Sequence, residues 1–142
     1  MRIAAALVSV MAGLALNACT EVETESATGY EPSKLTPVKG SGERVRVTFT
    51  KEGAERVGLE TARVRASGKR TIVPYSALMY DPAGKTYVYT SRTLLSYLRE
   101  PVEVARIDGN RVLLSDGPAA GTRVVTVGVS EVYGTELEVA SH

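Results

Sequence analysis

Residue types that carry out acid–base or nucleophilic catalysis are scarce in this chain. General acid–base and triad chemistry usually draws on histidine, and the 142 residues contain one histidine, His142. The run Ser67-Gly68-Lys69 is weakly similar to a phosphate-binding loop, but the earlier glycine is absent and Arg70 replaces the Ser or Thr that would bind magnesium. We therefore expect an ordinary loop here and predict that the protein is not an enzyme.

Metal-binding and nucleic-acid-binding patterns are also missing from the sequence. Soft metal ions need several Cys, Met or His side chains, and beyond the first eighteen residues Met79 is the only methionine. Packing of Met79 in the core is the better interpretation, so we predict no metal site and no cofactor. From residue 44 onward there are 14 basic and 11 acidic side chains, without the basic stripe and interleaved aromatic residues that nucleic-acid binding would want.

A group of tyrosines is the strongest candidate for a ligand or partner surface; its members are Tyr75, Tyr80, Tyr87, Tyr89 and Tyr97. Alternation along a strand would place Tyr87 and Tyr89 on one face. The pair could form a platform for a sugar or an apolar ligand, and cross-strand packing with hydroxyls in water is the competing interpretation. Exposed sheet edges offer a second route to a protein partner.

The first eighteen residues have the pattern of a signal peptide. Residues 3–16 are nearly all apolar, but they are fewer than the roughly 20 that a spanning helix needs. The sequence Leu16-Asn17-Ala18-Cys19 resembles a bacterial lipobox, although Asn17 stands where a small or β-branched residue is commoner. We predict that Cys19 is lipidated, because several acyl chains would anchor the protein stably where one chain would not. The expected location is the periplasmic or extracytoplasmic face of the cell membrane or the outer membrane.

Residues 19–43 are poor in large apolar side chains and predict a flexible acidic linker. The repeat Glu21, Glu23 and Glu25 could be interpreted as a cation site, but a solvated, self-repelling segment is favoured. The predicted organisation is therefore a lipoprotein signal peptide at 1–18, this linker at 19–43 and one β domain at 44–142.

The domain begins with a clear strand and helix pattern. Residues 44–50 alternate polar and apolar side chains, as a half-buried strand does. Thr50 is expected to cap a short helix at Lys51–Val57, and Gly58 to end it in a left-handed conformation. Gly53 weakens this helix.

The rest of the domain alternates short strand patterns with turn signals. Asp81-Pro82-Ala83-Gly84 and Asp108-Gly109 predict hairpin turns. We expect a polar connection at 66–70 and a helical turn at 129–133. Further strands are predicted at 59–65, 71–73, 86–90, 94–98, 102–107, 111–114, 123–127 and 136–139. The predicted fold is mainly β, a small antiparallel barrel or sandwich with one short helix.

Several segments also occur in a characteristic order. They are Val73-Pro74-Tyr75-Ser76-Ala77-Leu78, Tyr87-Val88-Tyr89, Arg99-Glu100-Pro101-Val102, Gly121-Thr122-Arg123-Val124-Val125-Thr126-Val127-Gly128-Val129 and Glu131-Val132-Tyr133-Gly134-Thr135-Glu136. In this order, residues 72–139 resemble the membrane-proximal domain of periplasmic adaptor subunits (membrane fusion proteins) of resistance-nodulation-division efflux systems. Residues 44–64 similarly resemble the segment that precedes the lipoyl domain in many adaptors.

The resemblance implies a shortened adaptor. A complete adaptor would insert a barrel, a lipoyl-like domain and a helical hairpin near residues 65–70, and this chain has no sustained heptad pattern for such a hairpin. The implied function is that of a lipid-anchored accessory component of transmembrane transport, which docks on an efflux transporter or on a full-length adaptor. The alternative is a ligand-binding lipoprotein outside efflux that uses the tyrosine surface, since a fold does not determine function.

Overall fold

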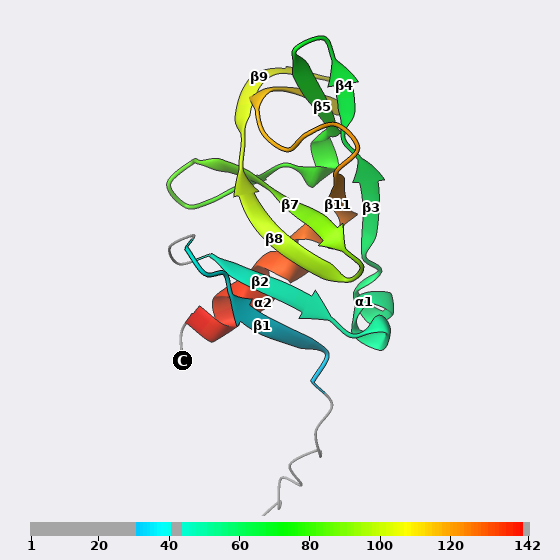
Figure 1. Ribbon diagram of the computed structural model, residues 1–142, viewed down its shortest axis with the longest axis vertical. Coiled ribbons are helices and arrows are strands. Elements are labelled where there is room, and N and C mark those ends of the chain that lie inside the picture. Colours follow the sequence, from blue (N-terminus) through cyan, green and yellow to red (C-terminus); the bar gives the residue numbers. More distant parts are fainter. Residues whose placement is uncertain (1–30, 41–43, 141–142) are drawn as a thin grey trace, which may run out of the picture.

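The computed structural model describes residues 31–40 and 44–140, and the structure is mainly β (Figure 1). Two helices, α1 (Lys51–Val57) and α2 (Val129–Ala140), and a short 3-10 turn, η1 (Tyr75–Ala77), accompany the strands. The strands are β1 (Ser33–Pro37), β2 (Val45–Phe49), β3 (Glu60–Arg63), β4 (Arg65–Ser67), β5 (Arg70–Pro74), β6 (Met79–Tyr80), β7 (Thr86–Thr93), β8 (Ser96–Pro101), β9 (Glu103–Asp108), β10 (Arg111–Asp116) and β11 (Arg123–Val127).

The strands form two antiparallel sheets. The larger sheet has the order β1-β2-β8-β7-β11-β3, with β6 paired to β7, and the smaller sheet has the order β4-β5-β10-β9. The smaller sheet lies at the top of Figure 1, at the far end from β1. Of the two predicted architectures, the described residues form a sandwich of open sheets rather than a closed barrel. The predicted fold class is therefore confirmed.

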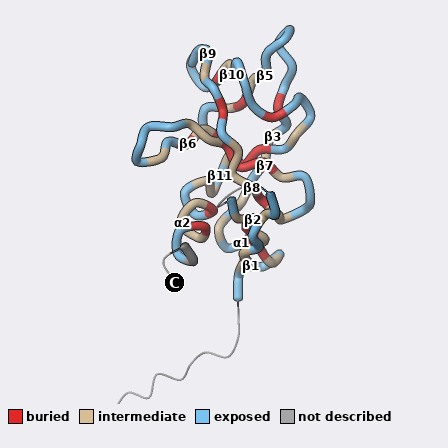
Figure 2. Tube along the Cα trace, turned by 60° about the vertical axis from the view of Figure 1, so that its left-hand side comes forward, coloured by how far each residue is buried: buried red, intermediate tan, exposed pale blue. Residues whose placement is uncertain are grey.

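The larger sheet separates two hydrophobic cores, because alternate residues of a strand point to opposite faces. On β7, Tyr89 belongs to the core that α2 covers, and Val88 belongs to the core beneath the smaller sheet. Val125 and Val124 divide in the same way on β11. Buried residues accordingly gather in the middle of the molecule between these elements (Figure 2).

The predicted helix at Lys51–Val57 is confirmed in its bounds and its caps. The Thr50 hydroxyl oxygen accepts a hydrogen bond from the Gly53 N–H at 3.0 Å, and Gly58 ends the helix at a φ of 66°. Pro32 also fixes the start of the helix, because its carbonyl accepts from the Thr50 N–H at 2.9 Å. Gly53 is buried against this carbonyl, so the glycine has a packing role.

The two predicted hairpin turns are also confirmed. Asp108 and Arg111 are paired across β9 and β10, and the positive φ of this two-residue turn falls on Gly109. In the other turn, the Asp81 carboxylate accepts from the backbone N–H groups of Ala83 and Lys85 at 2.9 and 2.8 Å. Asp81 thus closes the loop between β6 and β7.

The prediction of a linker reaching residue 43 is wrong for residues 33–37. They form the edge strand β1, which pairs with β2 along its whole length. Leu35 packs against the core under α2 and supplies the apolar contact that the composition of the segment conceals. The remaining part of the predicted linker up to residue 30, with its acidic repeat, lies outside the described residues.

The predicted strand at 94–98 is wrong at its start. Leu94 and Leu95 form the two-residue turn between β7 and β8, in which Thr93 pairs with Ser96. Leu95 has a φ of 60°, a conformation that Gly or Asn normally supplies. The sequence does not indicate this turn, because two leucines between strand-forming residues are themselves typical of a strand.

The predicted final strand at 136–139 is wrong, because residues 129–140 form the continuous helix α2. Its inner face is spaced as a helix requires, with Val129, Val132, Tyr133 and Glu136 at intervals of three and four residues. Glu136 is among the most buried of these positions, and a charged residue there hides the apolar stripe from a sequence search. The fold therefore has a second, longer helix than was predicted.

The polar connection predicted at 66–70 is instead the tip of a hairpin. β4 and β5 pair directly, with Ser67 opposite Arg70, so that Gly68 and Lys69 alone form the turn. Val64 joins β3 to β4, and its backbone N–H and C=O bond to Thr122 and Gly121 at 2.8 Å each. The chain thereby passes from one sheet to the other with its backbone groups paired.

The contact of Pro32 with α1 predicts an unusual result for a helical glycine. Replacing glycine by alanine inside a helix normally stabilises it by about 1 kcal/mol. Gly53→Ala should instead destabilise the protein by about 1–3 kcal/mol, because the new methyl group would collide with the Pro32 carbonyl oxygen. Gly134→Ala in α2 is the matched control: its methyl group meets nothing within 4 Å, and it should raise stability. Urea unfolding of both variants measures the difference, and equal stabilisation would contradict the placement of Pro32.

Candidate functional site

The two tyrosines predicted as a ligand surface are close together, but only Tyr87 reaches solvent. Tyr89 is fully buried in the core under α2, whereas Tyr87 is half-buried. The predicted Tyr87 and Tyr89 platform is therefore wrong as an exposed surface. The competing interpretation was packing between strands with the hydroxyls in water. Tyr89 is packed as that interpretation expects, but its hydroxyl is buried and does not reach water.

Tyr89 instead belongs to a buried polar cluster that holds α2 on the sheet. Its hydroxyl donates a hydrogen bond to Glu136 of α2, whose side chain is only 5% exposed. The Arg99 guanidinium of β8 forms an ion pair with the same carboxylate at 3.1 Å. One carboxylate thus joins α2 to two neighbouring strands of the larger sheet.

Two aromatic rings flank Arg99 and limit its access to water. Its guanidinium carbon lies 4.9 Å from the centre of the Tyr87 ring and 5.8 Å from that of Tyr133. Such cation–π contacts favour the charged side chain in a partly buried site. Burial, strengthened by the hydrogen bond to Glu136, raises the pKa of Tyr89 far above its ordinary range. This cluster, Tyr89–Glu136–Arg99, has the features of a structural lock.

The other predicted tyrosines do not join this cluster into one surface. Tyr97 is buried and packs edge-on against Phe49 with ring centres 6.1 Å apart, and burial raises its pKa. Tyr75 and Tyr80 are about half exposed, in η1 and in β6. The tyrosine group of the sequence is therefore divided between core and surface.

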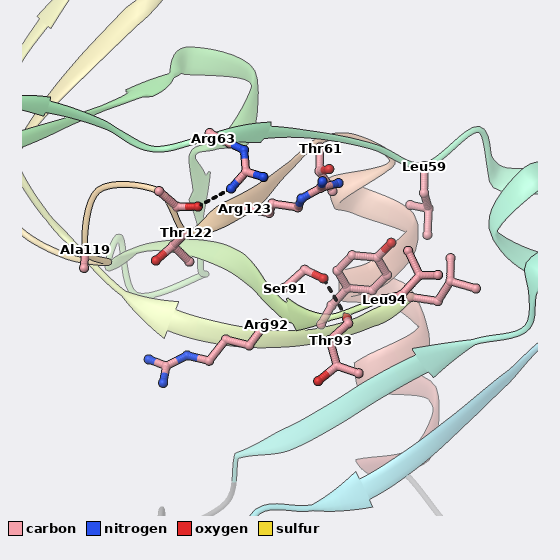
Figure 3. Close-up of a pocket in the computed structure, with 13 residues that line it drawn as sticks. Leu59, Thr61, Arg63, Ser91, Arg92, Thr93, Leu94, Ala119, Thr122 and Arg123 are labelled. Carbon is pink, nitrogen blue, oxygen red and sulfur yellow. Dashed lines mark hydrogen bonds between the residues drawn. The ribbon is translucent and has the colours of Figure 1, made fainter.

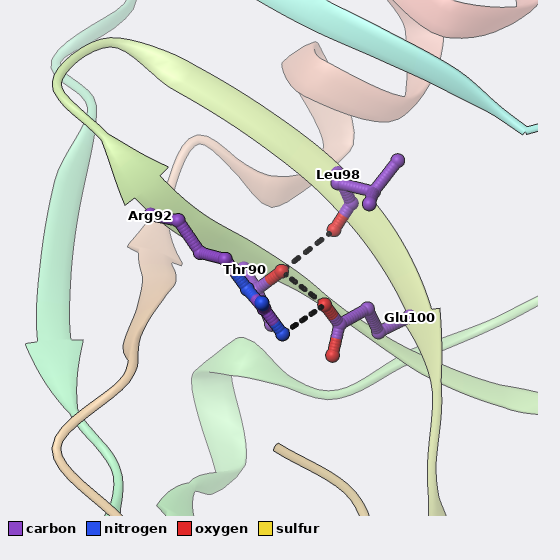
Figure 4. Close-up of polar contacts among 4 residues, drawn as sticks. All are labelled: Thr90, Arg92, Leu98 and Glu100. Atoms are coloured by element: carbon purple, nitrogen blue, oxygen red, sulfur yellow. Dashed lines mark hydrogen bonds and ion pairs between the residues drawn. The ribbon is translucent and has the colours of Figure 1, made fainter. Parts of the chain in front are cut away.

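A second polar group, around Thr90, lies on the opposite face of β7 (Figure 4). The Thr90 hydroxyl donates to Glu100 at 2.9 Å, and its contact with the Leu98 carbonyl measures 3.3 Å. Arg92 lies 3.9 Å from the same Glu100 oxygen. These contacts connect β7 with β8 and leave little room for a ligand, since the adjoining hollow has a volume of about 30 Å³.

A larger groove opens over the end of the larger sheet, between β3, β11 and the turn from β7 to β8 (Figure 3). Its volume is about 820 Å³. Arg63 and Arg123 line one part, while Leu59, Leu94 and Leu95 line another. No pattern in the sequence marks these residues as a site, because they come from three separate segments that only the sheet brings together.

Arg63 and Arg123 are directly opposite each other on β3 and β11, and Ser91 follows on β7 in the same row. Arg63 also donates to the Gly121 carbonyl at 3.0 Å, which holds its guanidinium in place. Among the described residues, neither arginine forms an ion pair with a carboxylate. Like charges opposite each other destabilise a sheet, so this row favours an anion in the groove.

The remaining predictions concern lipidation and metals. Met79 is buried in the core under α2, as predicted. The described ranges, 31–40 and 44–140, hold no group of three residues suited to binding a metal ion. In the same ranges, no helix combines the length and apolar character needed to cross a membrane. Cys19, the predicted lipidation site, and His142 lie outside the described residues.

Comparison of the chain with protein-family models, with curated proteins and with solved structures found no match. The site must therefore be interpreted from its own geometry. That geometry contains one structural lock, Tyr89–Glu136–Arg99, and one open groove with a cationic row.

Removing the carboxylate of the lock should strongly destabilise the protein. Glu136→Ala leaves the buried Tyr89 hydroxyl and the partly buried Arg99 without their shared partner, and the lost hydrogen bond and ion pair should together cost about 2–4 kcal/mol. Glu131→Ala, at an exposed position of the same helix, should cost less than about 1 kcal/mol. Chemical denaturation followed by circular dichroism measures both values, and similar losses would show that the lock contributes little.

The buried tyrosine predicts a loss of stability in alkali. Unfolded tyrosines ionise near pH 10, whereas the raised pKa of Tyr89 keeps its proton in the folded protein. Above about pH 10 the unfolded state therefore binds fewer protons, and the free energy of unfolding should fall by up to about 1.4 kcal/mol per pH unit for this group. Tyr89→Phe should remove that part of the slope, while Tyr75→Phe, at an exposed position, should not. Urea titrations between pH 8 and pH 11 test this, and an unchanged slope in Tyr89→Phe would contradict it.

Proposed function

We propose that the protein is a lipid-anchored extracytoplasmic docking component of a transmembrane transport assembly. It acts by stoichiometric contact with an efflux transporter or a full-length adaptor, and not by catalysis. The resemblance of residues 44–64 and 72–139 to adaptor sequences motivates this proposal. The observation that carries it is the way in which the first and last parts of the domain close one structure.

That closure involves strands from both ends of the domain. β2 pairs with β8 on one side and with β1 on the other, and α2 packs across this region. β3 pairs with β11 at the opposite edge of the sheet. A domain that loses its middle modules needs such pairing to remain folded, since each strand left unpaired would expose its backbone groups.

The hairpin at Gly68 and Lys69 supports the same interpretation. By the resemblance, a complete adaptor would insert its further modules near this hairpin, which here connects β4 to β5 with two residues. The smaller sheet has β4 and β9 as its two edge strands. These edges lie at the end of the molecule that is remote from β1 (Figure 1), so a chain tethered ahead of β1 presents them away from its anchor.

The edge strand β9 offers the better contact for a partner. Among the strands of residues 31–40 and 44–140, it pairs only with β10, and Ile107 on it is 45% exposed. An exposed strand edge can accept a strand from another protein. The alternative function, a ligand site at Tyr87 and Tyr89, loses support because Tyr89 is fully buried.

Photocrosslinking tests this docking role in cells. A photoreactive residue at Ile107 should crosslink to a transporter or to a full-length adaptor, identified by mass spectrometry. The matched control is the same residue at Leu137 of α2, which is also 45% exposed but is remote from the smaller sheet, and it should give little of that product. Cys19→Ser should abolish the incorporation of labelled palmitate, because it removes the thiol that would accept the lipid.

Two results would overturn parts of the proposal. Absence of any transport component in the crosslinks from Ile107, with the protein anchored and folded, would refute the docking role. Absence of labelled palmitate from the parent protein would refute lipidation.

A further inference from the structure

The groove of Figure 3 combines two surface features that are each unfavourable in water. One is the pair of opposed arginines, Arg63 and Arg123, which repel each other across β3 and β11. The other is Leu94, which is 81% exposed at the turn between β7 and β8. Both line the same hollow, so one ligand with an anionic part and an apolar part would relieve both.

The exposed leucine is held outward by its neighbour. Leu95 has a positive φ, and its side chain packs against the core under α2. Its carbonyl also accepts a hydrogen bond from the Phe49 N–H at 2.9 Å. This hydrogen bond fixes the turn to β2. Leu94 and Leu59 both line the groove, Leu94 from the turn and Leu59 from the residue before β3 (Figure 3). A strained residue maintained in this way points to a function for the turn.

The charges around the groove determine which way an amphiphilic ligand would be oriented in it. The arginine pair lines one part of the groove, and Leu59, Leu94 and Leu95 line another. The same three leucines also line a second, neighbouring hollow beside α1, whose lining includes Glu55 and Glu60. An anionic group is attracted to the arginines and repelled by these carboxylates. The headgroup therefore belongs at the arginine row, and the apolar part belongs between the two leucines.

The size of the groove favours a small amphiphile over a protein partner. Its volume of about 820 Å³ falls within the range of small-molecule sites, about 300–1,000 Å³. Buried Tyr97 lies beneath the groove, and Thr61 and Ser91 add hydroxyl groups near the arginines.

We propose that this groove binds an amphiphilic anion with a single acyl chain, whose carboxylate or phosphate contacts Arg63 and Arg123 and whose chain lies against Leu59 and Leu94. This site is separate from the docking edge at β9 and does not depend on the proposed transport function. Its ligand needs no covalent step, because the site supplies charge and apolar surface only.

Binding measurements with defined probes test the site. Oleate is the full probe, oleyl alcohol lacks the charge, and inorganic phosphate lacks the chain. The chain that begins at residue 19, without the predicted signal peptide and with Cys19→Ser, serves as the parent, so that neither a bilayer nor the apolar segment at residues 3–16 competes for the amphiphile. Isothermal titration calorimetry below the aggregation threshold of oleate should show one oleate per chain, weaker binding of oleyl alcohol, and no measurable binding of phosphate.

Matched variants locate the binding. Arg63→Gln combined with Arg123→Gln should weaken oleate binding at least about tenfold, because two charge-assisted contacts are lost. Arg65→Gln combined with Arg70→Gln removes the same charge from the neighbouring hairpin, outside the groove, and should change affinity by less than about twofold. The groove variant should melt no lower than the parent, because it relieves repulsion between opposed charges.

Leu94→Ser keeps the test decisive even if the arginine variant unfolds, because the exposed Leu94 side chain contributes little to the core. It should weaken oleate binding several-fold without lowering the melting temperature. The proposal is overturned if the folded parent binds no oleate, if oleyl alcohol or phosphate binds as tightly as oleate, or if Leu94→Ser and a folded arginine variant both bind it unchanged. These outcomes leave the crosslinks from Ile107 unaffected, so failure of this site and failure of the docking role are distinguishable.

Discussion

The buried carboxylate of Glu136 is the constraint on which the arrangement of the domain depends. A charged group in the interior costs several kcal/mol unless it is paired and hydrogen-bonded. Arg99 and the Tyr89 hydroxyl satisfy that requirement only when α2 lies at one position along the sheet. An apolar residue could slide along the core surface, whereas the carboxylate must meet both partners. The lock therefore specifies the position of α2, and α2 in turn covers β1 and β2, the first strands of the described chain.

The pairing of strands in the larger sheet also creates the groove that contains Arg63 and Arg123. β2 and β3 are at different positions in the strand order, and α1 carries the chain from one to the other. The groove lies beside this connection, bounded by β3 and by the turn from β7 to β8. Pairing β3 with β11 places Arg63 opposite Arg123, so the same hydrogen bonds that complete the sheet bring two positive charges together. Stability of the backbone and repulsion between side chains are thus linked at this edge.

Local signals in the sequence predicted those elements whose geometry depends on a few adjacent residues. Thr50 and Gly58 bound α1 as capping chemistry requires, and Asp108-Gly109 forms its hairpin turn. The failures have a common physical cause, which is that the deciding contact comes from elsewhere in the chain. Leu35 of residues 33–37 packs against the core under α2, and Glu136 has its partners, Tyr89 and Arg99, on β7 and β8. Leu95 adopts a turn conformation that its own side chain disfavours, because its carbonyl is bound by Phe49.

The candidate site likewise has features that the sequence predicted and features that it did not. Alternation correctly placed Tyr87 and Tyr89 on one side of a strand, but burial depends on what covers that side, and α2 covers Tyr89. The opposed arginines come from β3 and β11, and Leu94 comes from a turn that was expected to be strand. No short sequence pattern could therefore predict that these residues lie close together. By itself the amino-acid sequence determined the mainly β class, the first helix and the hairpin turns, because backbone preferences act over a few residues. Only the tertiary structure decided the position of α2, the burial of the tyrosines and the charged groove, because these depend on pairing and packing between segments far apart in the chain.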